Sequence, residues 1–420
     1  MIVSPIIMHR SDFVRIIVRV QWKKGGESVS KGLKRVFGLL VMVILLSVAV
    51  AGCGGDKKAA APATTDIKIG ANFELTGGQA TFGQSSLNGA KLAIKEINAS
   101  GGVLGKQITL IAADNKSEPS ESTNAITKLI TQDKVVAVLG AVTSSDTMVA
   151  SPVAHANKVP FISNTSTNPK VTVEDGKVKE YAFRACFIDP FQGTVMSNFA
   201  TKSLKAKTAA IYIDQSSDYA KGLAQFFEEG FVKSGGKIVS KEAYLQKDKD
   251  FKATLTKMKA SNPDVIFVPG YYEEVGLVVK QARELGYAGP MIGGDGWDSP
   301  KLVEIAGKEA LKNTFFSNHY AADDKDPRVV KFVETYKKEY GQVPDALAAL
   351  AYDSAMMLAD AIKRANSIES VKIKDALAQT KDLQVVSGVI TLDANHNPVK
   401  SAVVIEVKDG NLVFKEKVNP

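Results

Sequence analysis

Short runs of β-branched and other apolar residues alternate with amphipathic stretches along most of this chain. The first two runs cover 67–73 and 108–112, and between them Leu87, Ala90 and Ile94 recur at helical spacing. Strands that are separated by helices pair in parallel, because each helix returns the chain to the same end of the sheet. The pattern therefore predicts an α/β fold built from doubly wound parallel sheets.

The alternation falls into two series, followed by a C-terminal part with a different pattern. The first series predicts further helices over 120–131 and 145–156 and strands over 135–139 and 159–162. The second predicts strands over 208–213, 238–244, 265–268 and 291–292 and helices over 219–233, 251–260 and 273–285. The last part predicts helices over 327–340, 345–365 and 371–379 and strands over 389–392, 402–407 and 412–414. So long a chain exceeds what one hydrophobic core usually serves, so we expect two lobes.

The first 52 residues have the composition of an export signal. Three basic residues within 31–35 precede an apolar segment over 36–51, and small residues lead to Cys53. This order is typical of a lipoprotein signal peptide, which is cleaved before a cysteine that becomes acylated. The alternative is a transmembrane anchor, but the segment is shorter than the roughly 20 apolar residues that span a bilayer. We expect lipidation at Cys53, an extracytoplasmic location at a bacterial membrane, and a flexible tether over 53–65.

The positive charge of the chain belongs mostly to this leader. The sequence has 53 basic and 45 acidic residues, of which 1–52 hold eight and two, leaving 45 basic and 43 acidic residues. Nucleic-acid binding therefore loses its main support. Cys53 and Cys186 are the two cysteines. With Cys53 acylated, the chain can form no intrachain disulfide, and no metal cluster has its ligands.

Motifs of catalysis and of cofactor binding are missing from the sequence. It has no Walker loop, no G-x-G-x-x-G and no G-x-S-x-G, and His155, His319 and His396 stand in unrelated contexts. We therefore expect no enzymatic activity, no cofactor and no metal.

Two hydroxyl-rich loops follow neighbouring strands of the first series, where open parallel sheets bind their ligands. Ser144 and Ser145 open a predicted helix, whose free N–H groups and positive dipole end suit a carboxylate. Thr165 and Thr167 follow the next strand. Either loop alone could be an ordinary helix cap or turn. Together they indicate a carboxylate site.

A third loop, Gly293-Gly-Asp-Gly-Trp297, follows a strand of the second series. Its Asp295 could pair with an ammonium group, and Trp297 and Phe82 could line the site of an apolar side chain. Tyr219 and Tyr271 also lie at expected strand ends. The alternatives stay open: Trp297 could pack between lobes, and Asp295 could form a turn.

Several segments in order carry a family resemblance over residues 66–420. They are Ile67-Lys-Ile-Gly-Ala, Leu75-Thr-Gly-Gly, Gly140-Ala-Val-Thr-Ser-Ser, Phe183-Arg-Ala-Cys, Asp218-Tyr-Ala-Lys-Gly-Leu and Gly293-Gly-Asp-Gly-Trp. With them the chain resembles the periplasmic branched-chain amino-acid-binding proteins, which are solute receptors of ABC importers. The resemblance implies a periplasmic binding protein type I fold, in which two lobes are joined by three crossings.

The resemblance also implies where the lobes divide. The crossings are expected near Ile188, His319–Ala321 and Val386–Gly388. The first lobe would comprise 66–187 with 321–386, and the second lobe 188–320 with 387–420.

The ligand residues implied by the resemblance coincide with the strand-end loops. Ser144, helped by Thr165 and Thr167, would bind the ligand carboxylate, and Asp295 would bind its ammonium group. Tyr219 and Tyr271 would line the site.

The function implied is capture of an amino acid, branched-chain or otherwise apolar, by lobe closure. A monomer would deliver it to an ABC permease and ATPase complex. Two positions depart from the family pattern: Phe82 stands where tyrosine is frequent, and Asp295 where leucine receptors carry glutamate. Aromatic, polar or amide ligands therefore stay open. So do a receptor for urea or short amides and a ligand-sensing module for a signalling partner.

Overall fold

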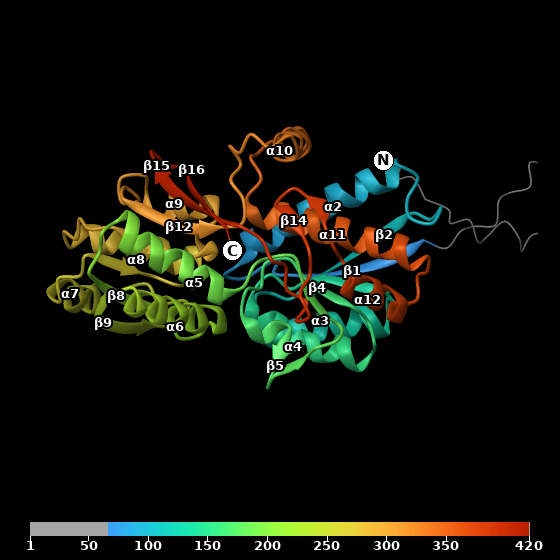
Figure 1. Ribbon diagram of the computed structural model, residues 1–420, viewed down its shortest axis with the longest axis horizontal. Coiled ribbons are helices and arrows are strands. Elements are labelled where there is room, and N and C mark those ends of the chain that lie inside the picture. Colours follow the sequence, from blue (N-terminus) through green and yellow to red (C-terminus); the bar gives the residue numbers. More distant parts are fainter. Residues whose placement is uncertain (1–65, 420) are drawn as a thin grey trace, which may run out of the picture. The chain divides into compact units, whose positions relative to one another are not determined.

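Two separate β-sheets organise the part of the chain that the computed structural model describes, residues 66–419 (Figure 1). The predicted signal segment 1–52, the lipidated Cys53 and the tether 53–65 lie outside the described residues. Among the described residues, no helix is both long enough and apolar enough to cross a membrane.

The first sheet is entirely parallel and has the strand order β2-β1-β3-β4-β7. Its strands are β1 (Ile67–Phe73), β2 (Ile108–Asp114), β3 (Ala137–Gly140), β4 (Phe161–Ser163) and β7 (Ala182–Arg184). The helices that follow β1, β2 and β3 are α2 (Ala80–Ala99), α3 (Pro119–Thr131) and α4 (Ser144–Ala156), respectively. All four residues of β3 are buried, as expected for a central parallel strand.

The second sheet has the order β16-β15-β12-β11-β10-β8-β9. The strands from β9 to β12 are parallel, whereas β15 and β16 add an antiparallel pair at one edge. The strands are β8 (Thr208–Asp214), β9 (Lys237–Tyr244), β10 (Val265–Phe267), β11 (Met291–Gly293), β12 (Thr314–Asn318), β15 (Ala402–Lys408) and β16 (Asn411–Val418). Its helices are α5 (Asp189–Asn198), α6 (Asp218–Lys233), α7 (Lys252–Ala260), α8 (Tyr272–Glu284) and α9 (Pro300–Ala306). The prediction of α/β parallel sheets is thus confirmed, with the antiparallel edge as an addition.

The strand order of both sheets reverses next to the first strand of each series. In each sheet, that strand (β1 or β8) lies between the second and third strands of its series. The chain therefore adds strands first on one side of it and then on the other. A crevice at the carboxyl ends of the strands opens at such a switch point. The loops after β1, β3, β8 and β10 are therefore the places where a ligand is expected.

The helices after the second crossing return to the first sheet. They are α10 (Pro327–Tyr340), α11 (Ala346–Ala365) and α12 (Ser370–Ala378). Helix α11 packs along α2. The two helices approach closely at Gly89, where a β-carbon would lie 2.0 Å from the carbonyl oxygen of Ala348. Only glycine fits at this contact.

The third passage between the sheets follows a short hairpin, β13 (Leu383–Val385) and β14 (Gly388–Ile390). The backbone N–H groups of Val386 and Ser387 donate to the carboxylate of Asp353 in α11, at 2.8 and 3.0 Å. The expected crossing at Val386–Gly388 lies within this hairpin. Its contacts with α11 favour a later crossing, between Ile390 and Ala402, where β15 begins.

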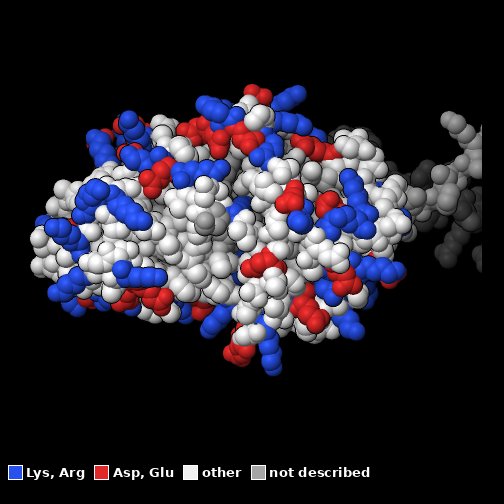
Figure 2. Space-filling model, viewed as in Figure 1, with Lys and Arg blue, Asp and Glu red and all other residues white. Residues whose placement is uncertain are grey.

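Charged side chains of both signs are interspersed over the face seen in Figure 2. This distribution agrees with the nearly balanced charge of the chain beyond residue 52. A single-sign surface of the kind that binds nucleic acid is not seen on this face.

Candidate functional site

A small cavity lies where the strand-end loops of the two sheets meet. About 280 Å³ of space not filled by atoms lies within it, part of which is open to solvent, so the cavity is small in this arrangement of the loops. The first sheet and its helices contribute Phe82, Val142, Thr143, Ser144, Thr165 and Leu347. The second contributes Tyr219, Tyr271, Asp295 and Gly296.

Six of the nine residues proposed from the sequence lie together around this cavity. They are Phe82, Ser144, Thr165, Tyr219, Tyr271 and Asp295. The other three, Ser145, Thr167 and Trp297, lie elsewhere, and each has a different structural reason.

Ser145 contacts α6, a helix of the second sheet, and does not line the cavity. Its hydroxyl donates to the carboxylate of Asp218 at 3.1 Å and accepts the backbone N–H of the same residue at 3.1 Å. These two bonds join the N-terminus of α4 to the N-terminus of α6.

Trp297 and Thr167 are buried away from the cavity. The indole of Trp297 is fully buried and donates to the carbonyl oxygen of Val268 at 2.9 Å. It thus packs within the core of the second sheet and does not line the cavity, where the sequence suggested that it could contact an apolar side chain. Thr167 is also buried, and its carbonyl oxygen accepts the backbone N–H of Asp189 at 3.0 Å.

The N-terminus of α4 forms the polar side of the cavity nearest the first sheet. Ser144 is the first residue of this helix, so its backbone N–H and the next two have no partner within the helix. The Ser144 hydroxyl oxygen accepts the backbone N–H of Asn168 at 3.2 Å, which leaves its own proton free to donate. Free N–H groups, a hydroxyl donor and the positive dipole end together suit a carboxylate.

The loop before α4 is held by a buried carboxylate that the sequence analysis did not identify. Glu74, at the end of β1, is fully buried and accepts the backbone N–H groups of Val142 and Thr143, at 3.1 and 3.0 Å. Thr165 contributes from the other side, because its hydroxyl donates to the carbonyl oxygen of Val142 at 2.9 Å. Thr165 therefore supports the loop through a hydroxyl that is already engaged.

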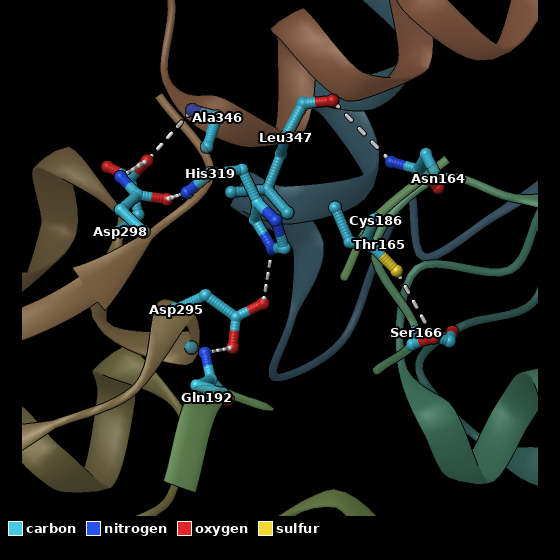
Figure 3. A network of polar contacts seen from close by, with 12 residues as sticks. Asn164, Thr165, Ser166, Cys186, Gln192, Asp295, Asp298, His319, Ala346 and Leu347 are labelled. Carbon is cyan, nitrogen blue, oxygen red and sulfur yellow. Dashed lines mark hydrogen bonds and ion pairs between the residues drawn. The ribbon is translucent and has the colours of Figure 1, made fainter. Parts of the chain in front are cut away.

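Asp295 provides the acidic side of the cavity, and two donors fix its carboxylate (Figure 3). Gln192 donates to Oδ1 at 2.7 Å, and His319 bonds to Oδ2 at 2.9 Å. Each carboxylate oxygen can accept two hydrogen bonds, so capacity remains toward the cavity. Asp295 is placed beside Tyr219, whose hydroxyl oxygen accepts the backbone N–H of Gly296 at 3.2 Å.

His319 is buried and lies against the first crossing. Its ring stacks on Phe187, with 3.8 Å between ring centroids. Burial lowers the pKa of His319, in opposition to its hydrogen bond with Asp295. The ring is therefore neutral at pH 7, and Nε2 must carry the proton, because its partner is a carboxylate acceptor. His319 therefore contributes to this contact as a neutral hydrogen-bond donor.

Aromatic and aliphatic side chains line the remaining surface of the cavity. Tyr219 and Tyr271 lie nearly parallel, with centroids 5.4 Å apart. Phe82 meets Tyr271 edge-on at 5.8 Å, and Leu347 comes from the start of α11. Such a lining suits an apolar side chain.

The sequence analysis missed several residues at or near the cavity, and only some of them could have been predicted. Val142 and Thr143 lie inside the Gly140–Ser145 segment that we had singled out, so the sequence already indicated their position. Leu347, Gln192 and Glu74 lie in segments with no local sign of a ligand. Only the tertiary structure brings Leu347 to the cavity, Gln192 to Asp295, and Glu74 to the backbone of residues 142–143.

These features define a class of protein: a two-lobe solute-binding protein of the periplasmic binding protein type I fold. A model of the periplasmic binding protein family matches residues 66–411. The chain belongs to this family.

Individual relatives agree with that assignment. Leu/Ile/Val-binding protein homolog 3 of Brucella melitensis is 31% identical over 350 residues, which cover 83% of this chain and 92% of that protein. The leucine binding protein LivK of Thermotoga maritima is 40% identical, with a TM-score of 0.80 over 84% of this chain and 99% of that one. LivJ of Streptococcus pneumoniae, solved in complex with isoleucine, is 41% identical, with a TM-score of 0.80 over 85% of this chain and 100% of that one. Such relatives are solute-binding proteins of ABC transporters and not enzymes, as the sequence analysis predicted.

Proposed function

We propose that this protein captures an apolar amino acid, with leucine, isoleucine and valine as the first candidates. The observation that carries the proposal is the pairing of opposite polar groups across one small cavity. The N-terminus of α4 with Ser144 lies on one side, and the carboxylate of Asp295, which is hydrogen-bonded to Gln192 and His319, lies on the other. A free amino acid has a carboxylate and an ammonium on one carbon, and it satisfies both.

The rest of the ligand follows from the lining of the cavity. With its two charges bound, an amino acid would place its side chain against Phe82, Tyr271 and Leu347. Because the space between these residues is small, we expect that side chain to be of modest size. The printed names of the relatives, which include leucine and isoleucine binding, support the branched-chain candidates.

Capture would proceed by closure of the two lobes on the ligand. The carboxylate site belongs to the first sheet and Asp295 to the second, so only the closed arrangement makes both sets of contacts. A ligand that binds the closed state more tightly shifts the population toward it. Direct contacts join the lobes in this state, such as the edge-on pair of Phe82 and Tyr272, whose ring centroids lie 4.9 Å apart.

Delivery would follow from a lipid anchor at Cys53, with an ABC permease and ATPase as the recipients. Membership of a family that serves ABC transporters supports this step. The order of basic, apolar and small residues before Cys53 supports the anchor. Mass spectrometry of the membrane-bound protein would detect an acylated N-terminal cysteine, and an intact leader on the mature protein would contradict it.

The experiment that tests capture is calorimetry with leucine and two matched analogues. The analogues are 4-methyl-2-oxopentanoate, which lacks the ammonium, and isopentylamine, which lacks the carboxylate. We expect leucine to bind and both analogues to lose most of the affinity. Tighter binding of urea or acetamide than of any amino acid would overturn the proposal.

A variant at Asp295 checks the assignment of the ammonium. Asp295→Ala should abolish measurable binding, because removing one partner of a buried charge pair costs about 2–5 kcal/mol. Ser144→Ala should cost only about 1 kcal/mol, since the helix N–H groups remain. Exposed Glu334→Ala is the matched control and should bind like the wild type. Undiminished affinity in Asp295→Ala would remove this assignment.

A further inference from the structure

Two buried acids lie directly beneath the loop that we assign to the ligand carboxylate. Glu74 has no exposed surface and Asp146 is 2% exposed. Both bind the same residue: the backbone N–H of Thr143 donates to Glu74 at 3.0 Å, and its hydroxyl donates to Asp146 at 2.8 Å. Because both acids bind polar groups of one residue, their carboxyl groups lie close together in the protein interior. Two buried carboxylates so near each other repel unless one of them holds a proton.

The surroundings favour retention of that proton. Burial, followed by the negative charge of Glu74, raises the pKa of Asp146 to about 9. Burial likewise raises the pKa of Glu74. Two other ionisable groups interact with Asp146, namely Glu118 and Tyr271, and both are acids that cannot compensate a second negative charge. One proton for two carboxylates is thus the arrangement expected at neutral pH.

The pair is rigidly connected to the ligand site. Glu74 accepts the backbone N–H groups of Val142 and Thr143, which line the cavity, and Asp146 belongs to the first turn of α4, next to Ser144. The backbone of Glu74 is itself fixed, because a β-carbon on Gly83 would lie 2.0 Å from its carbonyl oxygen. A change in the pair must therefore move the loop or break its hydrogen bonds.

We propose that Glu74 and Asp146 are a positioning pair that shares one proton and holds residues 142–144 in the shape that binds a carboxylate. Loss of this proton to hydroxide, which forms water, leaves two adjacent buried negative charges. Their repulsion displaces the loop and releases the ligand. This inference deepens the proposed function and rests on it, because it takes the loop to be the carboxylate site.

The test compares wild type with Asp146→Asn. The asparagine reproduces the protonated acid, since its amide N–H donates to Glu74 and its oxygen accepts from Thr143, but it has no proton to lose. We expect equal leucine affinity at pH 7. Between pH 7 and pH 10, the Kd of the wild type should rise about tenfold more than that of the variant, because only about one molecule in ten keeps the proton at pH 10. The amino group of leucine titrates equally in both experiments and cancels in the comparison.

A second readout needs no ligand. Because the folded protein keeps a proton that the unfolded chain has lost above about pH 4, its stability decreases as the pH rises from about 4 to about 9. The Tm of Asp146→Asn should therefore exceed that of the wild type by a margin that grows across this range. The control is Asp214→Asn, which changes a buried acid of the second sheet; in this variant the alkaline fall in affinity should persist.

The outcomes separate the two proposals. Parallel Tm curves and an equal alkaline loss of affinity in wild type and Asp146→Asn would overturn the shared proton. If wild type bound no amino acid, the proposed function would fail, whereas the Tm comparison would still decide whether the pair shares a proton. If Asp146→Asn does not fold, Glu74→Gln serves in its place, since its amide donates to Asp146 and its oxygen accepts from the loop.

Discussion

At Asp295, the carboxylate is fixed by two donors before a ligand arrives. Gln192 and His319 each bond one of its oxygens. A preorganised acid loses little side-chain entropy when an ammonium binds, so more of the interaction appears as affinity. We expect the neighbours that hold this aspartate at the cavity to compensate for its side chain being shorter than that of glutamate.

His319 should be replaceable by glutamine but not by leucine. The amide N–H of His319→Gln can donate to Asp295 as Nε2 does, so leucine affinity should fall only slightly. His319→Leu removes the donor and should weaken binding about tenfold, as expected for a lost hydrogen bond to a charged group. Calorimetry measures both variants. Equal losses in both would mean that the ring matters for packing on Phe187 instead.

The same histidine predicts a flat pH profile near neutrality. Burial lowers the pKa of His319, so it remains neutral where an exposed histidine titrates. Affinity in wild type should therefore stay constant between pH 7 and pH 6. A decline there that His319→Gln abolishes would show that the ring is protonated in this range.

At the scale of elements, the contact between α4 and α6 joins the helices of the two sheets directly. Ser145 and Asp218 exchange two hydrogen bonds outside the cavity. Ser145→Ala should leave the ligand preference unchanged but raise the dissociation rate several-fold, because a closed-state contact is lost at about 1 kcal/mol. Stopped-flow measurements with leucine and valine test this. A changed leucine-to-valine ratio would instead place Ser145 at the ligand.

Most elements of the two βα series were predictable from the sequence, because periodicity and turn residues agree with the fold there. Helix α5 was not predicted. Pro190 and Gly193 weaken its helical pattern, and it depends on packing against α6, where a β-carbon on Gly193 would lie 2.6 Å from Phe226. Strands β7 and β12 were missed as well.

The candidate ligand site was predictable at the level of loops more than of side chains. Strand ends indicate which loops meet, and on this basis Ser144 and Asp295 were placed on opposite sides of one cavity. The direction of each side chain depends on local geometry, which explains why Ser145 and Trp297 point elsewhere. Glu74 and His319 gain their roles only from neighbours distant in the sequence.

At the scale of the whole molecule, the two sheets are joined by three passages of the chain, two of which meet at the stacked rings of Phe187 and His319. Lobe movement about these passages should be visible in solution. We expect small-angle X-ray scattering to give a larger radius of gyration without leucine than with it, and no such change in Asp295→Ala. An unchanged radius in wild type would contradict capture by closure.

The contact of α2 with α11 has a consequence for the range of solutes. Because Gly89 lets the two helices nearly touch at Ala348, the neighbouring Leu347 is brought down over the cavity. Gly89 therefore sets how much space Leu347 leaves for a bound side chain, although Gly89 does not itself line the cavity. We expect a relative with a larger residue at this position to hold α11 farther away and to accept a larger ligand.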